Sequence, residues 1–246
     1  MTRWCWIAVV LALVVARPAA AYRPFDGTDA DVADVGEFEL ELGPVGYAAA
    51  PGARILTLGA FVANLGLAPR WELVLEGRGQ AALGAFSGSH RLALGDTALF
   101  GKHVFREGVL QDRPGVSAAV EFGPLLPGVF ADPGVGGQLA AIASYRWSML
   151  TMHVNGAARM ARTGQPGAFA GWIVEGPTDW RARPVAELAV DKGRWSAAAY
   201  SALAGVLWQI ADTVVVDGAL RTVRSATSSG YEVRAGLTWG WRVWGP

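Results

Sequence analysis

The most constraining feature of this sequence is a strict alternation near its C-terminal end. Residues 231–242 read Tyr-Glu-Val-Arg-Ala-Gly-Leu-Thr-Trp-Gly-Trp-Arg, with apolar groups at the odd-numbered positions and polar or small groups at the even-numbered ones. Successive side chains of a strand point to opposite faces, whereas a helical period would mix the two sets. The stretch therefore predicts a long strand with one apolar and one polar face.

The same pattern recurs along the chain, for example at 37–42, 71–78 and 186–191. Gly, Pro, Asp and Ser breaks separate these stretches and divide the chain into about twelve strands of roughly ten residues. The stretch at 195–209 is rich in Ala, Leu and Trp and does not reveal which face points inward. The predicted strands are 36–46, 53–64, 70–79, 95–106, 115–123, 135–145, 147–158, 168–176, 183–191, 195–209, 212–222 and 230–242.

Strand length and number favour a membrane barrel. Strands of about ten residues tilted near 45° span a bilayer, and bacterial single-chain barrels have even strand numbers. A soluble sandwich or lipocalin-like barrel also alternates, but with shorter and fewer strands and a polar outer face. Trp71, Tyr231, Trp239 and Trp241 lie near strand ends, as in an interfacial aromatic girdle. We predict an all-β, transmembrane antiparallel up-and-down β-barrel over residues 36–246.

The first residues indicate export. Arg3 precedes the apolar stretch 4–15, and Ala19-Ala20-Ala21 forms an A-x-A cleavage pattern. The stretch is too short for a membrane-spanning helix, which needs about 20 residues. We predict a cleaved signal peptide over 1–21, a mature start at Tyr22 and localisation in the bacterial outer membrane. Cys5, the only cysteine, is removed with the leader, so the mature chain has no disulfide.

Charge excludes one class of partner. Lys plus Arg and Asp plus Glu both number 21, which leaves no basic excess to neutralise nucleic-acid phosphates. The expected partners are outer-membrane lipid and the outer-membrane assembly machinery. Barrels commonly end on an aromatic residue that this machinery recognises, but here Gly245 and Pro246 follow Trp244.

Residues 22–35 form an acidic arm before the first strand. Its aspartates, Asp26, Asp29, Asp31 and Asp34, do not match a calcium loop, because Asp31 occupies the position that requires Gly and Ala30 a ligand position. We predict a flexible or lumen-inserted arm and no metal or cofactor site.

Connection lengths suggest an orientation. The connections at 65–69, 145–146 and 209–211 are short, as expected for periplasmic turns, whereas 80–94 and 124–134 are long, as expected for outward loops. The segments 107–114 and 176–182 break this rule.

If the apolar faces contact lipid, the polar faces line the lumen. An Arg or Lys that faced lipid near the midplane would cost about 2–4 kcal/mol. Ten acids against seven bases indicate either a passage with slight cation preference or a lumen filled by charge pairs. The predicted lumen residues are Glu37, Glu39, Glu41, Glu72, Glu76, Asp96, Glu121, Glu187, Asp217 and Glu232, with Arg78, Lys102, Arg106, Arg146, Arg221, Arg234 and Arg242, and the hydrogen-bonding His153 and Asn155.

A barrel enzyme such as an outer-membrane phospholipase or lipid A deacylase needs a histidine that activates a serine. His90 lies near Ser87 and Ser89 in a loop, while Ser148 faces away from His153. We therefore predict no catalytic residues.

Several short segments carry a family resemblance: 23–30, 36–41, 94–97, 153–156 and 235–239. Together they resemble the outer-membrane proteins grouped as the "meta-pathway of phenol degradation" family, which implies a barrel with a transport function. We predict porin-like passage of a small solute or hydrophobic molecule. The alternatives are a closed structural or adhesion-type barrel and a lipid-acting barrel enzyme.

Overall fold

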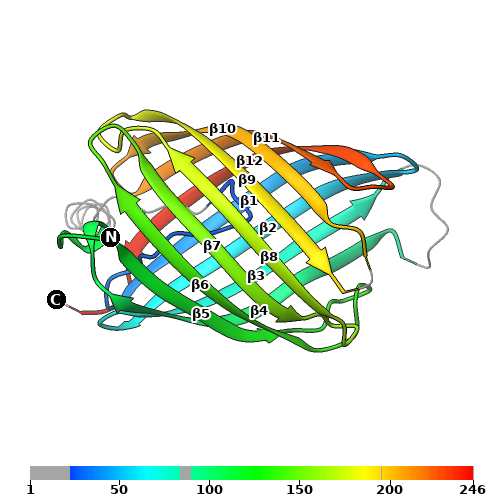
Figure 1. The fold of residues 1–246 in the computed structure, drawn as a ribbon, viewed down its shortest axis with the longest axis horizontal. Helices are drawn as coiled ribbons and strands as arrows, with labels where there is room; N and C mark the ends of the chain where they lie inside the picture. The colour runs from blue at the N-terminus through cyan, green and yellow to red at the C-terminus, as the bar shows by residue number, and fades with distance from the viewer. Residues whose placement is uncertain (1–22, 84–89, 195, 246) are drawn as a thin grey trace, which may run out of the picture.

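The chain folds into one closed barrel of antiparallel strands (Figure 1). The computed structural model describes residues 23–83, 90–194 and 196–245, so the predicted leader at 1–21 lies outside the described residues. The predicted class and strand number are confirmed. The twelve strands are β1 (Glu37–Ala50), β2 (Ala53–Ala68), β3 (Trp71–Ala82), β4 (Leu92–Arg106), β5 (Ser117–Leu125), β6 (Gly136–Arg146), β7 (Thr151–Met160), β8 (Pro166–Glu175), β9 (Ala182–Gly193), β10 (Ala199–Ala211), β11 (Val214–Arg224) and β12 (Ser229–Arg242).

Each strand pairs with its neighbours in the chain, and β1 pairs with β12 to close the ring. Glu37 lies opposite Arg242 at this closure. Closure satisfies the backbone groups that an open sheet edge would leave unpaired in lipid. Among the described residues, no helix is long and apolar enough to cross a membrane.

Two strands, β7 and β10, begin four residues later than the sequence predicted. β7 starts at Thr151 rather than at 147, because Trp147 N donates to Leu150 O and closes a turn over 147–150. β10 starts at Ala199 rather than at 195. In the connection from β9 to β10, Gly193 N donates to Ser196 Oγ. Both stretches are apolar, and hydropathy alone does not distinguish an apolar turn from an apolar strand.

β2 contains a bulge and extends beyond its predicted end. The register with β3 shifts between Thr57 and Ala60, where Gly59 has a φ of 73°. A positive φ strains residues with a Cβ, so glycine suits this position. β2 then continues to Ala68.

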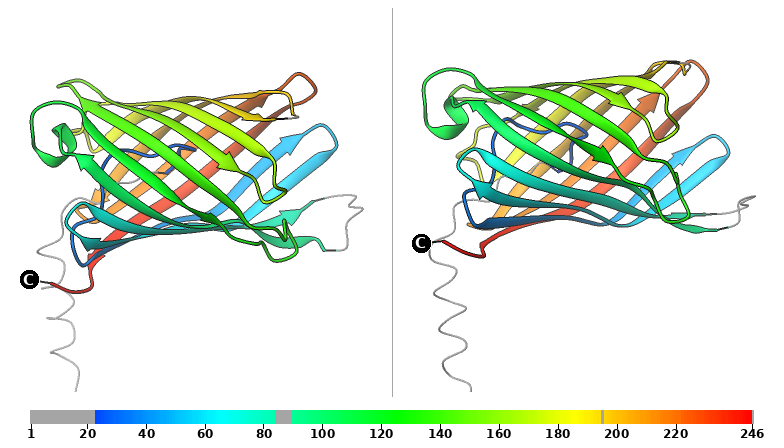
Figure 2. Two further views of the ribbon diagram at one scale, coloured as in Figure 1. Left: turned by 60° about the horizontal axis from the view of Figure 1, so that its bottom comes forward. Right: turned by 90° about the horizontal axis from the view of Figure 1, so that it is seen from below.

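The start of β1 and the end of β12 lie at the same end of the barrel, here called the terminal end (Figures 1 and 2). Short turns at 69–70 and 212–213 lie at this terminal end, whereas the connection at 126–135 lies at the opposite, loop end. The two exceptions to the length rule, now 107–116 and 176–181, also lie at the terminal end. The first of them contains the 3₁₀ helix η1 (Val109–Gln111), whose Gln111 side chain reaches the arm described below.

The outer face of the barrel is apolar, whereas the inner face combines buried charged groups with small apolar clusters. Buried residues of the wall include Glu41, Lys102 and Glu187, whereas the apolar Trp172 and Leu188 are about half exposed on the outer face. This inverts the pattern of a soluble protein and fits a barrel wall that contacts lipid. The facing of β10 is now settled. It buries the leucines Leu203 and Leu207 and exposes Val206, Trp208 and Ile210.

Candidate functional site in the barrel lumen

An N-terminal arm, residues 23–36, runs inside the barrel (Figures 1 and 2). It enters no sheet, so its backbone N–H groups need acceptors elsewhere. Side chains of five strands supply them. The contacts are Arg23 N to Glu41 Oε2 at 2.9 Å, Asp26 N to Glu187 Oε2 at 2.9 Å, Gly27 N to Glu187 Oε1 at 2.8 Å, Thr28 N to Asn155 Oδ1 at 3.0 Å, Ala30 N to Ser144 Oγ at 2.9 Å and Ala33 N to Glu72 Oε2 at 2.6 Å.

These acceptors lie in turn on β1, β9, β7, β6 and β3, so the arm crosses the lumen and follows the inner wall. Each contact satisfies two groups at once. A buried carboxylate without donors and a buried N–H without an acceptor would both be costly. The inward-facing glutamates and the arm therefore stabilise one another.

Arm side chains form ion pairs with the basic residues of the wall. Asp26 lies 2.5 Å from Arg221 and 2.8 Å from Arg234. Arg234 also binds Glu232 at 2.8 Å and donates to Pro24 O at 2.6 Å. The first arm aspartate is thus part of a buried network of charged groups.

The other arm aspartates meet the wall and the turns of the terminal end. Asp29 lies 3.5 Å from Lys102 Nζ, and Asp34 lies 3.9 Å from Arg242. Gln111 Nε2 donates to Ala30 O and to Asp31 Oδ1, both at 2.9 Å. Burial and the nearby negative charge of Asp29 raise the pKa of Asp31 to about 6.

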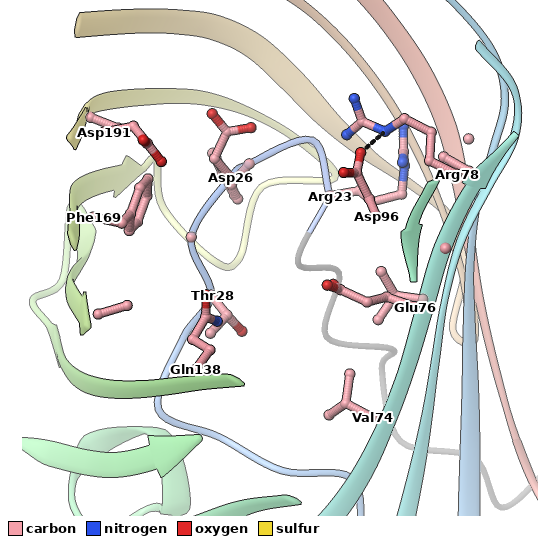
Figure 3. Close-up of a pocket in the computed structure, with 18 of the residues that line it drawn as sticks. Arg23, Asp26, Thr28, Val74, Glu76, Arg78, Asp96, Gln138, Phe169 and Asp191 are labelled. Atoms are coloured by element: carbon pink, nitrogen blue, oxygen red, sulfur yellow. Dashed lines mark ion pairs between the residues drawn. The ribbon is translucent and has the colours of Figure 1, made fainter. Parts of the chain in front are cut away.

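A cavity of about 750 Å³ lies between the arm and the loop end of the barrel. Its lining extends from arm residues 23–28 to Ala199 and Val223 near the loop-end strand termini. Figure 3 shows Asp26 and Thr28 of the arm within it, with Phe169 and Asp191 on one wall and Glu76, Arg78 and Asp96 on the other. Residues 23–28 of the arm therefore form part of the wall of this cavity.

Charge pairs line this cavity. Arg78 lies 3.5 Å from Asp96, and Arg159 lies 2.5 Å from Asp191. Arg162 donates to the backbone oxygens of Leu126 and Thr97. The whole lining contains nine acidic and seven basic residues, so the cavity has a small excess of acidic groups.

The predicted lumen residues fall into three groups. The residues that contact the arm are Glu37, Glu41, Glu72, Lys102, Asn155, Glu187, Asp217, Arg221, Arg234 and Arg242. Those that line the cavity at a distance from the arm are Glu76, Arg78, Asp96, Glu121 and Glu232. Glu39, Arg146 and His153 lie on the same inner face and belong to neither group. That the set lines a route for solutes stays a prediction.

One basic residue that was predicted to face the lumen, Arg106, faces outward. The register between β4 and β5 shifts between Val104 and Arg106, and Arg106 then pairs with Ala118. Ala118 lies between the buried Ser117 and Ala119 and so faces outward. The bulge therefore turns Arg106 away from the lumen, which an unbroken period of two could not show.

A buried Ser-His-Glu cluster was missed by the sequence analysis. Ser144 Oγ lies 2.8 Å from His153 Nδ1, so a serine other than Ser148 reaches this histidine. His153 Nε2 lies 3.3 Å from Glu175 Oε1, and Arg183 Nε donates to Glu175 Oε2 at 3.0 Å. Ser144 and His153 are opposite one another on β6 and β7, a relation that depends on strand register.

This cluster holds the arm rather than facing a substrate. Ser144 Oγ accepts the Ala30 N–H, and Ser144 and His153 are 1% and 3% exposed. The contact of His153 Nε2 with Glu175 is close enough for an ion pair but is not aligned as a hydrogen bond. None of the three residues lines the cavity.

The fold is that of the bacterial outer-membrane β-barrels. An outer membrane channel from Pseudomonas putida F1 has a TM-score of 0.62 at 12% identity, covering 89% of this chain and 100% of that one. The KdgM porin in complex with disordered oligogalacturonate gives 0.56 at 9% identity, with 82% and 98% covered. The CymD monoaromatic hydrocarbon channel gives 0.50 at 10%, with 85% and 89% covered.

At these identities the likeness establishes the fold. No model of a protein family matches the sequence, and no curated protein matches it. The resemblance to the phenol meta-pathway family is therefore supported at the level of an outer-membrane channel fold and no further.

Proposed function

We propose that this protein is an outer-membrane channel for small solutes and that the arm forms the narrowest part of its passage. The observation that carries the proposal is the cavity of about 750 Å³, whose lining includes residues 23–28 of the arm and extends to Ala199 and Val223 near the loop end. A volume of this size accommodates a small molecule with its hydration water. A barrel built only for attachment would have no need of such a space.

The lining favours a polar solute with a slight preference for cations. Paired arginines and carboxylates exchange hydrogen bonds readily with a hydrated molecule, and the excess of acids attracts positive charge. Glu76 and Glu121 carry this preference best. Both line the cavity, and neither makes a hydrogen bond or ion pair with another described residue.

A closed structural barrel is the second candidate, and one observation favours it. Side chains of five strands accept hydrogen bonds from the arm backbone, and ion pairs such as Arg221 with Asp26 join the arm to further strands. A lumen held in this way could remain shut. A lipid-acting enzyme has weaker support, because Ser144 lies beneath the arm and outside the cavity.

Single-channel recording from the refolded protein in a planar bilayer distinguishes these candidates. A channel predicts discrete conductance and a reversal potential that reports cation preference in a KCl gradient at pH 8.5. Silence from a correctly folded, heat-modifiable barrel would instead support the closed form.

A pair of variants tests the role of the cavity carboxylates. Glu76→Gln/Glu121→Gln is expected to lower the cation preference without changing the arm. The matched control is Glu107→Gln/Asp112→Asn, which alters two exposed acids of the 107–116 connection at the terminal end. An equal reversal potential in both variants would contradict the assignment of selectivity to the cavity.

A further inference from the structure

Three basic residues lie on the outer wall at the loop end of the barrel. Arg54 is near the start of β2, Lys192 is near the end of β9 and Arg224 ends β11. Each is four residues from an exposed leucine on the same strand face. These leucines are Leu58, Leu188 and Leu220, exposed by 45%, 56% and 52% respectively. Since strand side chains alternate, all three bases point away from the lumen.

Tyrosines complete this part of the wall. Tyr200 lies opposite Arg224, and Tyr231 lies opposite Ala49, which in turn lies opposite Arg54. The rings of Tyr47 and Tyr231 are 6.1 Å apart between centroids. The six residues Arg54, Lys192, Arg224, Tyr47, Tyr200 and Tyr231, here called the basic outer patch, lie on the consecutive strands β9, β10, β11, β12, β1 and β2.

The patch has no acidic counterpart. The segments 47–56, 192–200 and 222–231 contain four bases and no Asp or Glu. The guanidinium groups of Arg54 and Arg224 have no hydrogen bond or ion pair with any described residue, while Lys192 Nζ donates to Ser196 O. In Figure 1 the β1–β2 and β11–β12 hairpins extend side by side at the loop end of the barrel.

The side chains of this surface indicate which class of ligand it would bind. Bases at a membrane edge keep their charges at the headgroup level while their stems lie along apolar surface, and tyrosines prefer the same level. Unpaired guanidinium groups bind phosphate oxygens strongly. The leucines below the patch would contact acyl chains. A phosphorylated lipid supplies both groups, whereas a free anion supplies only the first.

We propose that the basic outer patch binds the phosphate groups of a phosphorylated glycolipid in the outer leaflet, with its acyl chains along Leu58, Leu188 and Leu220. Lipid A is the probe of this chemistry. The site lies on the outside of the wall and is separate from the cavity, so it does not depend on solute passage.

Native mass spectrometry of the refolded protein with bisphosphorylated lipid A tests the proposal. The variant Arg54→Gln/Lys192→Gln/Arg224→Gln removes the three charges and is expected to weaken binding about a hundredfold, given the contribution of each basic residue at a membrane surface. The matched control is Arg70→Gln/Arg113→Gln/Arg181→Gln, three exposed bases at the terminal end. Heat modifiability verifies that both variants fold.

Two further measurements identify the source of the phosphate. Dephosphorylated lipid A is expected to bind the wild type as weakly as lipid A binds the patch variant. Inorganic phosphate at the same concentration is expected not to displace lipid A. Equal lipid A binding by the patch and control variants would overturn the proposal, and so would full displacement by inorganic phosphate.

Discussion

The carboxylate of Glu187 accepts two consecutive backbone N–H groups of the arm, with its Oε1 atom 2.8 Å from Gly27 N. Its other oxygen lies 2.9 Å from Asp26 N. One side chain of β9 thus fixes the arm where it crosses the lumen. Because hydrogen bonds to charged groups contribute about 1.5–3 kcal/mol each, this residue is a principal anchor.

Removing this anchor should loosen the arm without opening the barrel. We expect Glu187→Ala to increase amide exchange at 26–28 by at least about tenfold while heat modifiability is unchanged, since the loss is local and exceeds 1.4 kcal/mol. Hydrogen exchange with mass spectrometry measures this. Glu187→Gln keeps one acceptor oxygen, so its amide exchange rate at 26–28 should lie between those of the wild type and Glu187→Ala. Unchanged exchange in Glu187→Ala would show that other contacts hold the arm.

A disulfide between the arm and β7 should lock the passage. A Cβ added at Gly27 would lie 3.0 Å from Asn155 Cγ, about the separation of Cβ and the far sulfur across a disulfide. The predicted mature chain has no other cysteine. We expect oxidised Gly27→Cys/Asn155→Cys to show lower and steadier conductance than the reduced form. The Gly27→Cys single variant is the control, and identical conductance in both redox states would mean that the arm does not move.

Acidification should strengthen the seating of the arm. The pKa of Asp31 is raised to about 6 in the folded protein, above the ordinary 3.8. A raised carboxyl pKa means that the seated arm binds a proton more tightly than the released arm, so seating gains stability as pH falls through 6 toward 3.8. Amide exchange at 30–33, corrected for intrinsic rates, should therefore slow between pH 7.5 and pH 5. Asp31→Asn should remove this dependence, and its persistence in that variant would assign it to another group.

The Ser144 cluster should behave as a structural contact. Ser144 Oγ is engaged by the Ala30 N–H and covered by the arm, so we expect no labelling of Ser144 by a fluorophosphonate probe. Ser144→Ala should cost about 1 kcal/mol of arm stability, seen as faster exchange at Ala30. Stoichiometric labelling of Ser144 in the folded barrel would instead favour the lipid-acting enzyme.

The sequence predicted the wall of this barrel well because the responsible signal is local. Alternation assigns Glu232 and Arg234 to one face and Tyr231 and Val233 to the other, and the structure places the first pair within the polar network and the second on the exposed wall. Where an extra residue breaks the period, as before Arg106, the prediction fails. The predicted start of β7 at 147 is wrong for a related reason. Residues 147–150 form an apolar turn, and hydropathy does not specify where a strand begins.

The side-chain contacts in the lumen depend on strand register and barrel closure, which no local sequence pattern contains. His153 meets Ser144 because the register of β6 against β7 places them opposite one another, nine positions apart in the chain. Asp26 meets Arg234 only because the arm folds back into a closed ring of strands, across a separation of 208 positions. Which face of each strand is polar follows from a period of two along one segment. Which polar groups meet, and that an arm lies among them, follows from closure and register, which the whole chain determines together.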